Sequence, residues 1–261
     1  MASKHNNLHL EPIASKTKLN IKQMHKANNT YTKHGAMLHE FLCVFSCHGW
    51  ILYVGSDTPF LLNPITTTSV GLAYLNLSEK FASLGSGAMS APPSDPKCTF
   101  LLIDEDDAIL YRVQDDRRVR LSLPLPEKSP RSSIIASTTV FSGGRFYCVS
   151  SKCCFYVIDP VPPQPLVRQF KMNTDEIPRE QWANFLVESD GEVLLAVTLC
   201  DPSHPDREVL SGFQVFRPRY SENKWVRVRS IGDRALFIHQ FCCFSLSASG
   251  VGCKKNCIYH P

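Results

Sequence analysis

The feature of this sequence that most constrains its fold is a unit of short apolar runs that recurs along the chain. In the first copy, apolar runs at 41–45, 50–54 and 60–64 are separated by Ser-Cys-His-Gly and Gly-Ser-Asp-Thr-Pro. Short apolar runs bounded by Gly, Pro, Asp and Ser predict strands and turns rather than helices. Comparable pairs of runs return further along the chain, within 100–113, 146–158, 193–216 and 236–246.

The spacing of these units predicts the architecture. Their turns fall near residues 49, 106, 144, 191 and 232. A repeat of about 40 to 50 residues made of short antiparallel strands is typical of a β-propeller, in which small sheets stack radially around an axis. We therefore predict an all-β propeller with about five traceable blades, and the sequence leaves open whether its ring is complete. A β-sandwich, which also contains many short strands, is the alternative architecture.

Three segments are predicted to form a helix or loops rather than strands. Residues 176–185 fit one short helix, although Pro178 falls in its first turn. Segments 83–96 and 124–133 are expected to be long loops because they are rich in Gly, Ser or Pro. The second contains Lys-Ser-Pro-Arg at 128–131, which a kinase could modify, but a plain exposed loop is the simpler interpretation.

Composition and charge divide the chain in two. Hydrophobic residues make up 43% and charged residues 20%, which excludes a disordered or coiled-coil chain. Residues 1–39 hold six lysines and a single acid, Glu11, whereas the rest of the chain is nearly neutral. We predict that 1–39 form a basic, disordered tail and that 40–261 form the folded domain. Because the folded part carries no excess positive charge, a nucleic-acid partner is not expected.

The same segments give expectations about the compartment. The sequence contains no apolar run long enough for a membrane-spanning helix, and the tail lacks the apolar core of a secretory signal. Eleven cysteines are an odd number, so we expect free thiols in a reducing compartment. The expected location is the cytoplasm or nucleus. The mitochondrion or chloroplast is the alternative because the tail is poor in acids, although it contains no arginine.

Known catalytic patterns are absent. The sequence has no phosphate-binding loop, no His-Glu-x-x-His and no Gly-x-Ser-x-Gly elbow, and Gly85-Ser86-Gly87 is too short to replace one. Cys47 and His48 are adjacent, but neighbours on a strand diverge, so His48 is expected to be a turn residue rather than a base. No catalytic residue is assigned.

Two candidate metal sites are weak. The acidic run 104–107 lies between two predicted strands and lacks the ligand order of a calcium-binding loop, so we expect a solvated hairpin tip. Cys253, Cys257 and His260 provide three of the four ligands of a structural zinc site. Cys242 or Cys243 would have to supply the fourth. No metal or cofactor is therefore predicted.

Several segments resemble the plant KIB-type β-propeller family, which is often attached to an F-box. The resemblance covers roughly residues 40–260. The segments that carry it are 46–52 with 60–64, the central strand 185–192, and a C-terminal signature at 230–237, 244–248 and 252–259.

This resemblance implies a propeller that serves as a recognition surface. In family members with an F-box, the propeller holds a target while the F-box docks onto a Skp-type adaptor of a ubiquitin ligase. Residues 1–39 contain no Leu-Pro-x-Asp-Leu-like opening of an F-box, which speaks against a Skp-type adaptor as a partner. The family pattern also continues with further strands beyond the Cys-Ile-Tyr at 257–259. The resemblance therefore implies an open sheet edge, with low stability or a need for a partner.

The residues that carry the resemblance are expected to support the scaffold. Gly49 and Gly232 suit turns with positive φ, and Trp50 suits a buried position between blades. Binding residues are left unassigned because propeller ligands usually contact loops on one face.

These observations predict a non-catalytic protein-interaction module with an unidentified protein partner. One alternative is an organelle-directed relative with a regulatory or structural role. Another is a truncated fragment without function. An enzyme ranks last because no nucleophile, base or metal stands at a suitable spacing.

Overall fold

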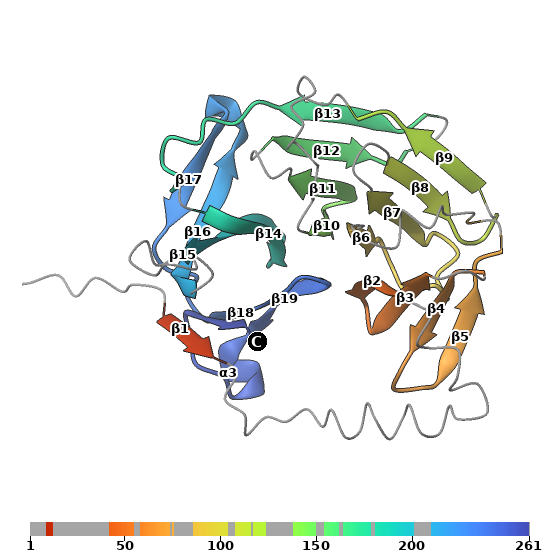
Figure 1. The fold of residues 1–261 in the computed structure, drawn as a ribbon, viewed down its shortest axis with the longest axis horizontal. Coiled ribbons are helices and arrows are strands. Elements are labelled where there is room, and N and C mark those ends of the chain that lie inside the picture. The colour runs from red at the N-terminus through yellow and green to blue at the C-terminus, as the bar shows by residue number, and fades with distance from the viewer. Residues whose placement is uncertain are drawn as a thin grey trace, which may run out of the picture.

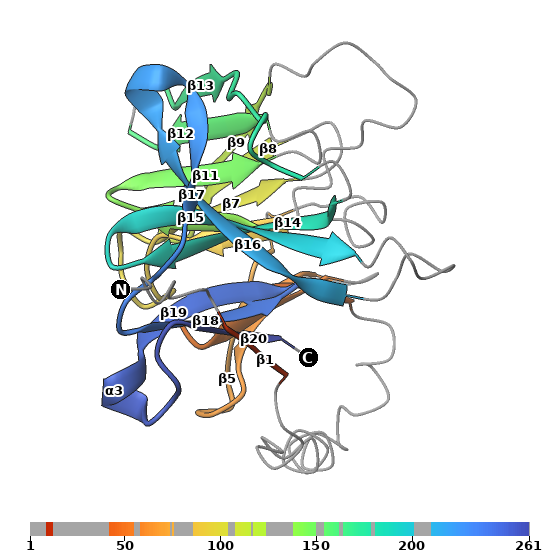
Figure 2. The same ribbon diagram turned by 90° about the vertical axis from the view of Figure 1, so that its left-hand side faces the viewer.

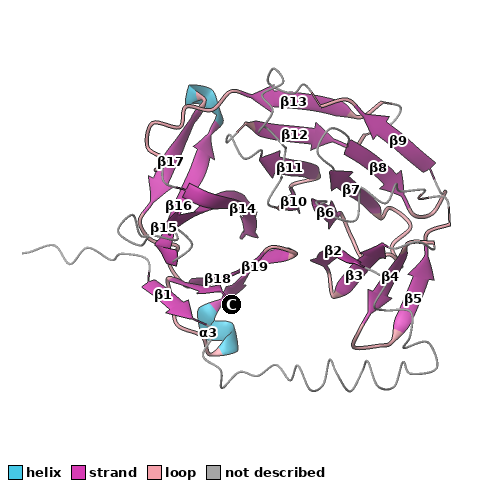
Figure 3. Ribbon diagram, viewed as in Figure 1, coloured by secondary structure: helices cyan, strands magenta, loops and turns pink. Residues whose placement is uncertain are grey.

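The computed structural model describes residues 9–12, 42–54, 58–73, 75, 86–103, 108–115, 117–123, 138–149, 154–161, 164–178, 181–200 and 210–260. The described strands form five four-stranded sheets, and Figure 1 shows these sheets arranged as blades around a common axis. The prediction of a β-propeller with five blades is therefore confirmed. Strands account for nearly all of the regular structure (Figure 3).

Blades 1 to 4 share one simple topology, in which four consecutive antiparallel strands run from the axis to the outer edge. Blade 1 contains β2 (Leu42–Cys47), β3 (Trp50–Val54), β4 (Phe60–Asn63) and β5 (Thr68–Gly71). Blade 2 contains β6 (Ser86–Met89), β7 (Thr99–Ile103), β8 (Ala108–Arg112) and β9 (Arg117–Leu121). Blade 3 contains β10 (Thr139–Ser142), β11 (Arg145–Val149), β12 (Phe155–Asp159) and β13 (Leu166–Phe170). Blade 4 contains β14 (Gln181–Ser189), β15 (Glu192–Cys200), β16 (Leu210–Arg219) and β17 (Lys224–Val228), with η2 (Tyr220–Glu222) between its last two strands.

Blade 5 is built from both ends of the chain. Its strand order is β1-β20-β18-β19, with β19 innermost. The β18–β19 pair is antiparallel, whereas β20 pairs in parallel with both β18 and β1. The helix α3 projects at one end of this blade (Figure 2). Its elements are β1 (His9–Pro12), β18 (Arg234–His239), β19 (Cys242–Ser247), α3 (Ala248–Val251) and β20 (Cys257–His260).

The predicted tail thus contributes one strand to the fold. Residues 9–12 form β1, with the register His9 opposite Cys257 and Pro12 opposite His260. Residues 1–8 and 13–39 lie outside the described residues, and the division of the chain at residue 39 stays a prediction.

Tight turns join the first two strands of three blades. His48 and Gly49 have φ values of 51° and 78°, Gly143 and Gly144 have 54° and 79°, and Asp190 and Gly191 have 56° and 80°. Two consecutive positive φ values suit the right-handed twist of a hairpin and favour Asn, Asp or Gly. The predictions of positive φ at Gly49 and Gly232, whose φ is 62°, are confirmed.

Apolar side chains fill the spaces between consecutive blades. Trp50, Leu52 and Phe45 of blade 1 pack with Phe100 and Tyr111 of blade 2 in one buried cluster. Similar clusters join blade 2 to blade 3, blade 3 to blade 4, and blade 4 to blade 5. Burial of apolar surface between sheets is the main stabilising contribution in a fold of this kind. The prediction of Trp50 between blades is confirmed, since only 9% of its surface is exposed.

The predicted helix at 176–185 is wrong. Its second half belongs to β14, the innermost strand of blade 4, which pairs antiparallel with β15 from Ser189 opposite Glu192 back to Gln181 opposite Leu199. Residues 174–177 form a turn closed by a hydrogen bond from Ile177 N to Thr174 O. Pairing with a neighbouring strand outweighs the weak local preference for helix.

The predicted loop at 83–96 is wrong in part, because Ser86–Met89 form β6, the innermost strand of blade 2. A Cβ atom at Gly87 would lie 2.6 Å from Phe45 Cδ1 and 2.8 Å from Leu101 O. The glycine that suggested a loop is therefore the residue that lets this strand approach its neighbours. The second predicted loop, 124–133, lies outside the described residues together with its Lys-Ser-Pro-Arg motif. Within the described part of the chain, no helix is long and apolar enough to cross a membrane.

Candidate functional site

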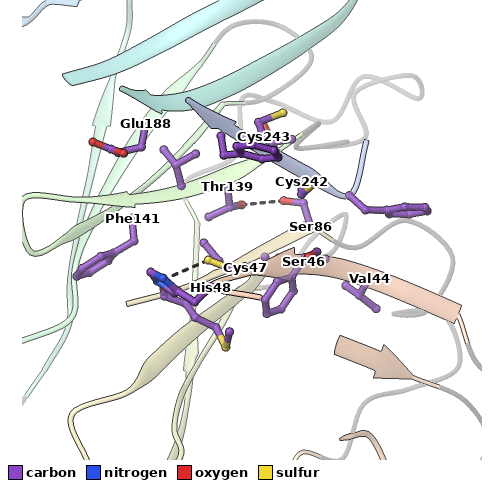
Figure 4. Close-up of a pocket in the computed structure, with 18 of the residues that line it drawn as sticks. Val44, Ser46, Cys47, His48, Ser86, Thr139, Phe141, Glu188, Cys242 and Cys243 are labelled. Carbon is purple, nitrogen blue, oxygen red and sulfur yellow. Dashed lines mark hydrogen bonds between the residues drawn. The ribbon is translucent and has the colours of Figure 1, made fainter. Parts of the chain in front are cut away.

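The inner strands of all five blades surround a cavity at the axis of the propeller. The cavity measures about 430 Å³, which is within the usual size range of ligand-binding pockets. Figure 4 shows side chains from β2, β6, β10, β14 and β19 around it. Its polar and thiol side chains are Ser46, Cys47, His48, Ser86, Thr138, Thr139, Glu188, Gln240, Cys242, Cys243 and Ser245.

Hydroxyl groups tie the inner strands to one another. The Oγ atom of Ser86 and Oγ1 of Thr139 lie 2.7 Å apart and join β6 to β10 (Figure 4). Thr138 Oγ1 accepts a hydrogen bond from Leu186 N at 2.6 Å and donates one to Leu186 O at 3.2 Å. Ser189 and Ser245 pair at 2.9 Å between β14 and β19. Part of the polar lining therefore holds the ring together and is already hydrogen-bonded.

Cys47 is the last residue of β2, and His48 lies in the turn that follows, as predicted. The Cys47 thiol donates to Met89 O at 3.7 Å, and His48 Nε2 lies 3.2 Å from the same carbonyl oxygen. Burial raises the pKa of the Cys47 thiol. A protonated thiol is a poor nucleophile. The pair therefore fixes blade 1 to blade 2 rather than forming a nucleophile and its base.

Two other ionisable groups of the cavity, Glu188 and Cys243, are not activated nucleophiles either. The carboxylate of Glu188 accepts a hydrogen bond from Gly191 N at 2.8 Å, which closes the turn between β14 and β15. Desolvation by burial raises the pKa of the Cys243 thiol to about 12. The described lining thus presents hydroxyl groups, amides and apolar surface to a ligand. It suits hydrogen bonding and apolar contact.

The residues weighed as metal ligands do not come together. Cys257 Sγ donates to Lys255 O at 3.3 Å, and the ring of His260 lies 5.5 Å from that of Phe213. Among the described residues, no three His, Cys, Asp or Glu side chains are grouped so that they could hold a metal ion. The acidic run 104–107 lies outside the described residues. Nine of the described cysteines, Cys43, Cys47, Cys98, Cys148, Cys154, Cys242, Cys243, Cys253 and Cys257, take part in no disulfide bond.

Little in the sequence indicated this cavity. Ser86 and Thr139 lie 53 positions apart, and neither belongs to a motif. Cys47, Cys242 and Cys243 stood out as cysteines in apolar runs, but their convergence depends on how the blades close into a ring. A sequence signal exists only for the scaffold, because the hairpin turns near residues 49, 144 and 191 mark the ends of β2, β10 and β14.

The fold and the cavity define a class of protein: a β-propeller of four-stranded blades whose axial cavity is lined by hydrogen-bonding and apolar groups. The sequence matches the model of the KIB1-4 β-propeller over residues 19–261. This chain therefore belongs to the KIB1-4 β-propeller family, as its sequence motifs indicated.

Two similar proteins are F-box proteins of Arabidopsis thaliana. F-box protein At2g17690 is 41% identical over 61 residues, which cover 23% of this chain and 14% of the relative. F-box protein At2g26160 is 45% identical over 49 residues, which cover 18% of this chain and 15% of the relative. The matched segments thus span about one seventh of each relative's length.

Solved structures with a similar backbone have little sequence in common with this chain. One is a chain in the S. cerevisiae complex of Dbp5 with Nup159, Gle1, IP6 and ADP, with a TM-score of 0.43 and 8% identity; the match covers 74% of this chain and 48% of that one. Another is in the complex of KlAtg21 with the coiled coil of AgAtg16, with a TM-score of 0.44 and 10% identity, covering 80% and 63%. No functional statement follows from these likenesses.

Proposed function

We propose that this chain is a non-catalytic protein-interaction module, comparable to the target-recognition domain of plant F-box proteins. The observation that carries the proposal is the lining of the axial cavity. Its described residues present hydroxyl groups, amides and apolar side chains and no activated nucleophile. The two F-box relatives support the same role, since both are F-box proteins by name and are similar to this chain in sequence.

The recognition chemistry follows from the exposed part of the lining. Gln240 is exposed and offers both donors and an acceptor. Phe244, of which 43% is exposed, supplies an aromatic surface in the same lining. Aromatic side chains surrounded by hydrogen-bonding groups contribute much of the affinity at protein interfaces. The expected ligand is a polypeptide segment that places an apolar side chain against Phe244 and hydrogen-bonds to its rim.

A peptide-display selection on the full chain tests this proposal. Peptides that bind the wild-type chain are measured against Gln240→Lys, which places a charge in the cavity lining. The matched control is Gln164→Lys, an exposed position between β12 and β13 outside the cavity. We expect Gln240→Lys to weaken binding at least about tenfold, a change of about 1.4 kcal/mol, and Gln164→Lys to leave it unchanged. Equal affinities for both variants would place recognition elsewhere and overturn the proposal.

We also propose that the protein acts in the cytoplasm or nucleus. The support is the position of residues 9–12, which form a strand of blade 5. An import peptide is removed after entry into an organelle, and removal of this segment would take a strand from the fold. Fluorescent tags placed at the N-terminus and at the C-terminus in separate plant cell lines test this. Cytoplasmic or nuclear signal from both tags is expected. Organelle signal from the C-terminal tag alone would contradict it.

A further inference from the structure

The contact between blade 5 and blade 1, here called the closing seam, differs from the other four seams. A buried apolar cluster fills each of the other four seams. Among the described residues, no such cluster joins blade 5 to blade 1. On the inner strand β19, Phe244 and Leu246 remain 43% and 37% exposed. A backbone hydrogen bond of 2.8 Å from Ser46 N to Phe241 O crosses the closing seam.

One cysteine of blade 1 faces this seam. Cys43 lies opposite Tyr53 in the β2–β3 register, and side chains alternate between the two faces of a sheet. Leu52 and Val54, the neighbours of Tyr53 in β3, point into the cluster shared with blade 2. Tyr53 and Cys43 therefore lie on the opposite face, which is turned toward blade 5.

One cysteine of blade 5 faces the seam from the other side. Cys242 lies opposite His239, whereas Cys243 lies opposite Ile238. Ile238 and Cys243 pack in the cluster shared with blade 4. Because neighbours on a strand point to opposite faces, Cys242 lies on the face turned toward blade 1.

Both cysteines lie within three residues of the hydrogen bond that crosses the closing seam. Ser46 is three residues after Cys43, and Phe241 directly precedes Cys242, so the hydrogen bond between Ser46 and Phe241 holds both strands together there. Both cysteines are free and partly exposed. Burial, with the proximity of Cys242 as the smaller cause, raises the pKa of the Cys43 thiol to about 11.

We propose that Cys43 and Cys242 form a reversible disulfide that ties blade 5 to blade 1 across the closing seam. The bond joins the first and the last inner strands of the ring and so encloses nearly the whole propeller in one covalent loop. A cross-link over so long a loop restricts the unfolded chain strongly. The modification stabilises the one seam that lacks a buried cluster of described residues.

Oxidised glutathione supplies the oxidant. Burial raises the pKa of the Cys242 thiol, so only a small fraction is thiolate at neutral pH. That thiolate attacks one sulfur of oxidised glutathione, which forms a mixed disulfide and releases one glutathione thiolate. The Cys43 thiolate then attacks the Cys242 sulfur and releases the second glutathione. The two protons lost by the protein thiols end on the two glutathione thiolates. One disulfide is thus formed in the protein while one molecule of oxidised glutathione is reduced to two of glutathione.

Peptide mapping of the full chain tests the proposal. The chain is equilibrated with increasing ratios of oxidised to reduced glutathione, blocked with an alkylating agent, digested without reductant and analysed by mass spectrometry. We expect a linked pair of peptides that contain Cys43 and Cys242, and its loss on reduction. The melting temperature should rise by about 5–10 °C in the cross-linked form. If the oxidised chain carries other linkages or only glutathione adducts at these positions, the proposal is wrong.

Serine variants separate this disulfide from general oxidation. Cys43→Ser and Cys242→Ser should each abolish the rise in melting temperature on oxidation. Cys253→Ser, in the connection between α3 and β20, is the matched control and should retain it. A rise that persists in either of the first two variants would contradict the assignment. Because the peptide map is made on the wild-type chain, it decides the question even where a variant fails to fold.

Discussion

At the scale of single residues, Asp233 shows how one carboxylate organises a corner of blade 5. Its Oδ2 atom accepts hydrogen bonds from Ser249 Oγ at 2.6 Å and from Ser247 Oγ at 2.8 Å. Lys255 Nζ lies 3.2 Å from Oδ1. The hydrogen bonds from Ser249 and Ser247, together with Lys255, lower the pKa of Asp233 to about 2. The ionised carboxylate thus holds the start of β18 against α3.

This lowered pKa predicts a dependence of stability on acid. A carboxyl group whose pKa is lower in the folded state stabilises the fold above its unfolded pKa of about 3.9 and loses that contribution as the pH falls toward 2. Asp233→Asn should therefore melt a few degrees below the wild type at pH 7, and the two should converge near pH 2. Thermal melts at pH 7, 4, 3 and 2 measure this.

An exposed aspartate provides the control. Asp190→Asn lies in the turn between β14 and β15, where its φ of 56° suits Asn as well as Asp. It should leave the melting temperature nearly unchanged across the series. A gap between wild type and Asp233→Asn that stays constant down to pH 2 would rule out the carboxylate as its cause.

At the scale of elements, the sequence predicted strands best where turn residues flank apolar runs. The hairpins around residues 49, 144 and 191 match β2–β3, β10–β11 and β14–β15 in the positions of their turns. β6 was missed because its residues resemble a loop, and the first half of β14 was missed because it resembles a helix, although the family resemblance indicated a strand at 185–192. Both are innermost strands. Each pairs with the next strand of its own blade and also contacts the inner strands of two other blades, so part of the force that makes it a strand is not local.

A substitution at Gly87 tests whether close packing around β6 stabilises the fold. The new Cβ atom in Gly87→Ala would meet Phe45 Cδ1 at 2.6 Å, Leu101 O at 2.8 Å and Leu102 Cδ2 at 2.9 Å. Overpacking of this kind costs about 1–3 kcal/mol in the free energy of unfolding. Urea titration should show this loss. Gly71→Ala in β5, where no atom lies within 4 Å of the new Cβ, should cost much less. Equal losses in the two variants would show that close packing at Gly87 is unimportant.

At the scale of the whole molecule, the repeat predicted the number of blades but not how the last one is built. Blades 1 to 4 follow the chain, so a local repeat is enough to find them. Blade 5 combines β1 with β20, whose residues His9 and Cys257 are nearly a full chain length apart. Parallel pairing between such distant strands leaves no local pattern. The axial cavity was unpredictable for the same reason, since its lining depends on the complete ring.

The strand β1 offers a test of whether both ends of the chain stabilise blade 5. Removal of residues 1–12 would leave the backbone of β20 unpaired on its outer side, and an exposed sheet edge destabilises the blade and promotes association between chains. We expect a melting temperature several degrees lower and a larger apparent mass in light scattering. Removal of residues 1–8 alone keeps β1 and is the matched control. If both truncations behave like the full chain, blade 5 draws its stability from β18, β19 and β20 alone, because the remaining pairing and the cluster shared with blade 4 would then suffice.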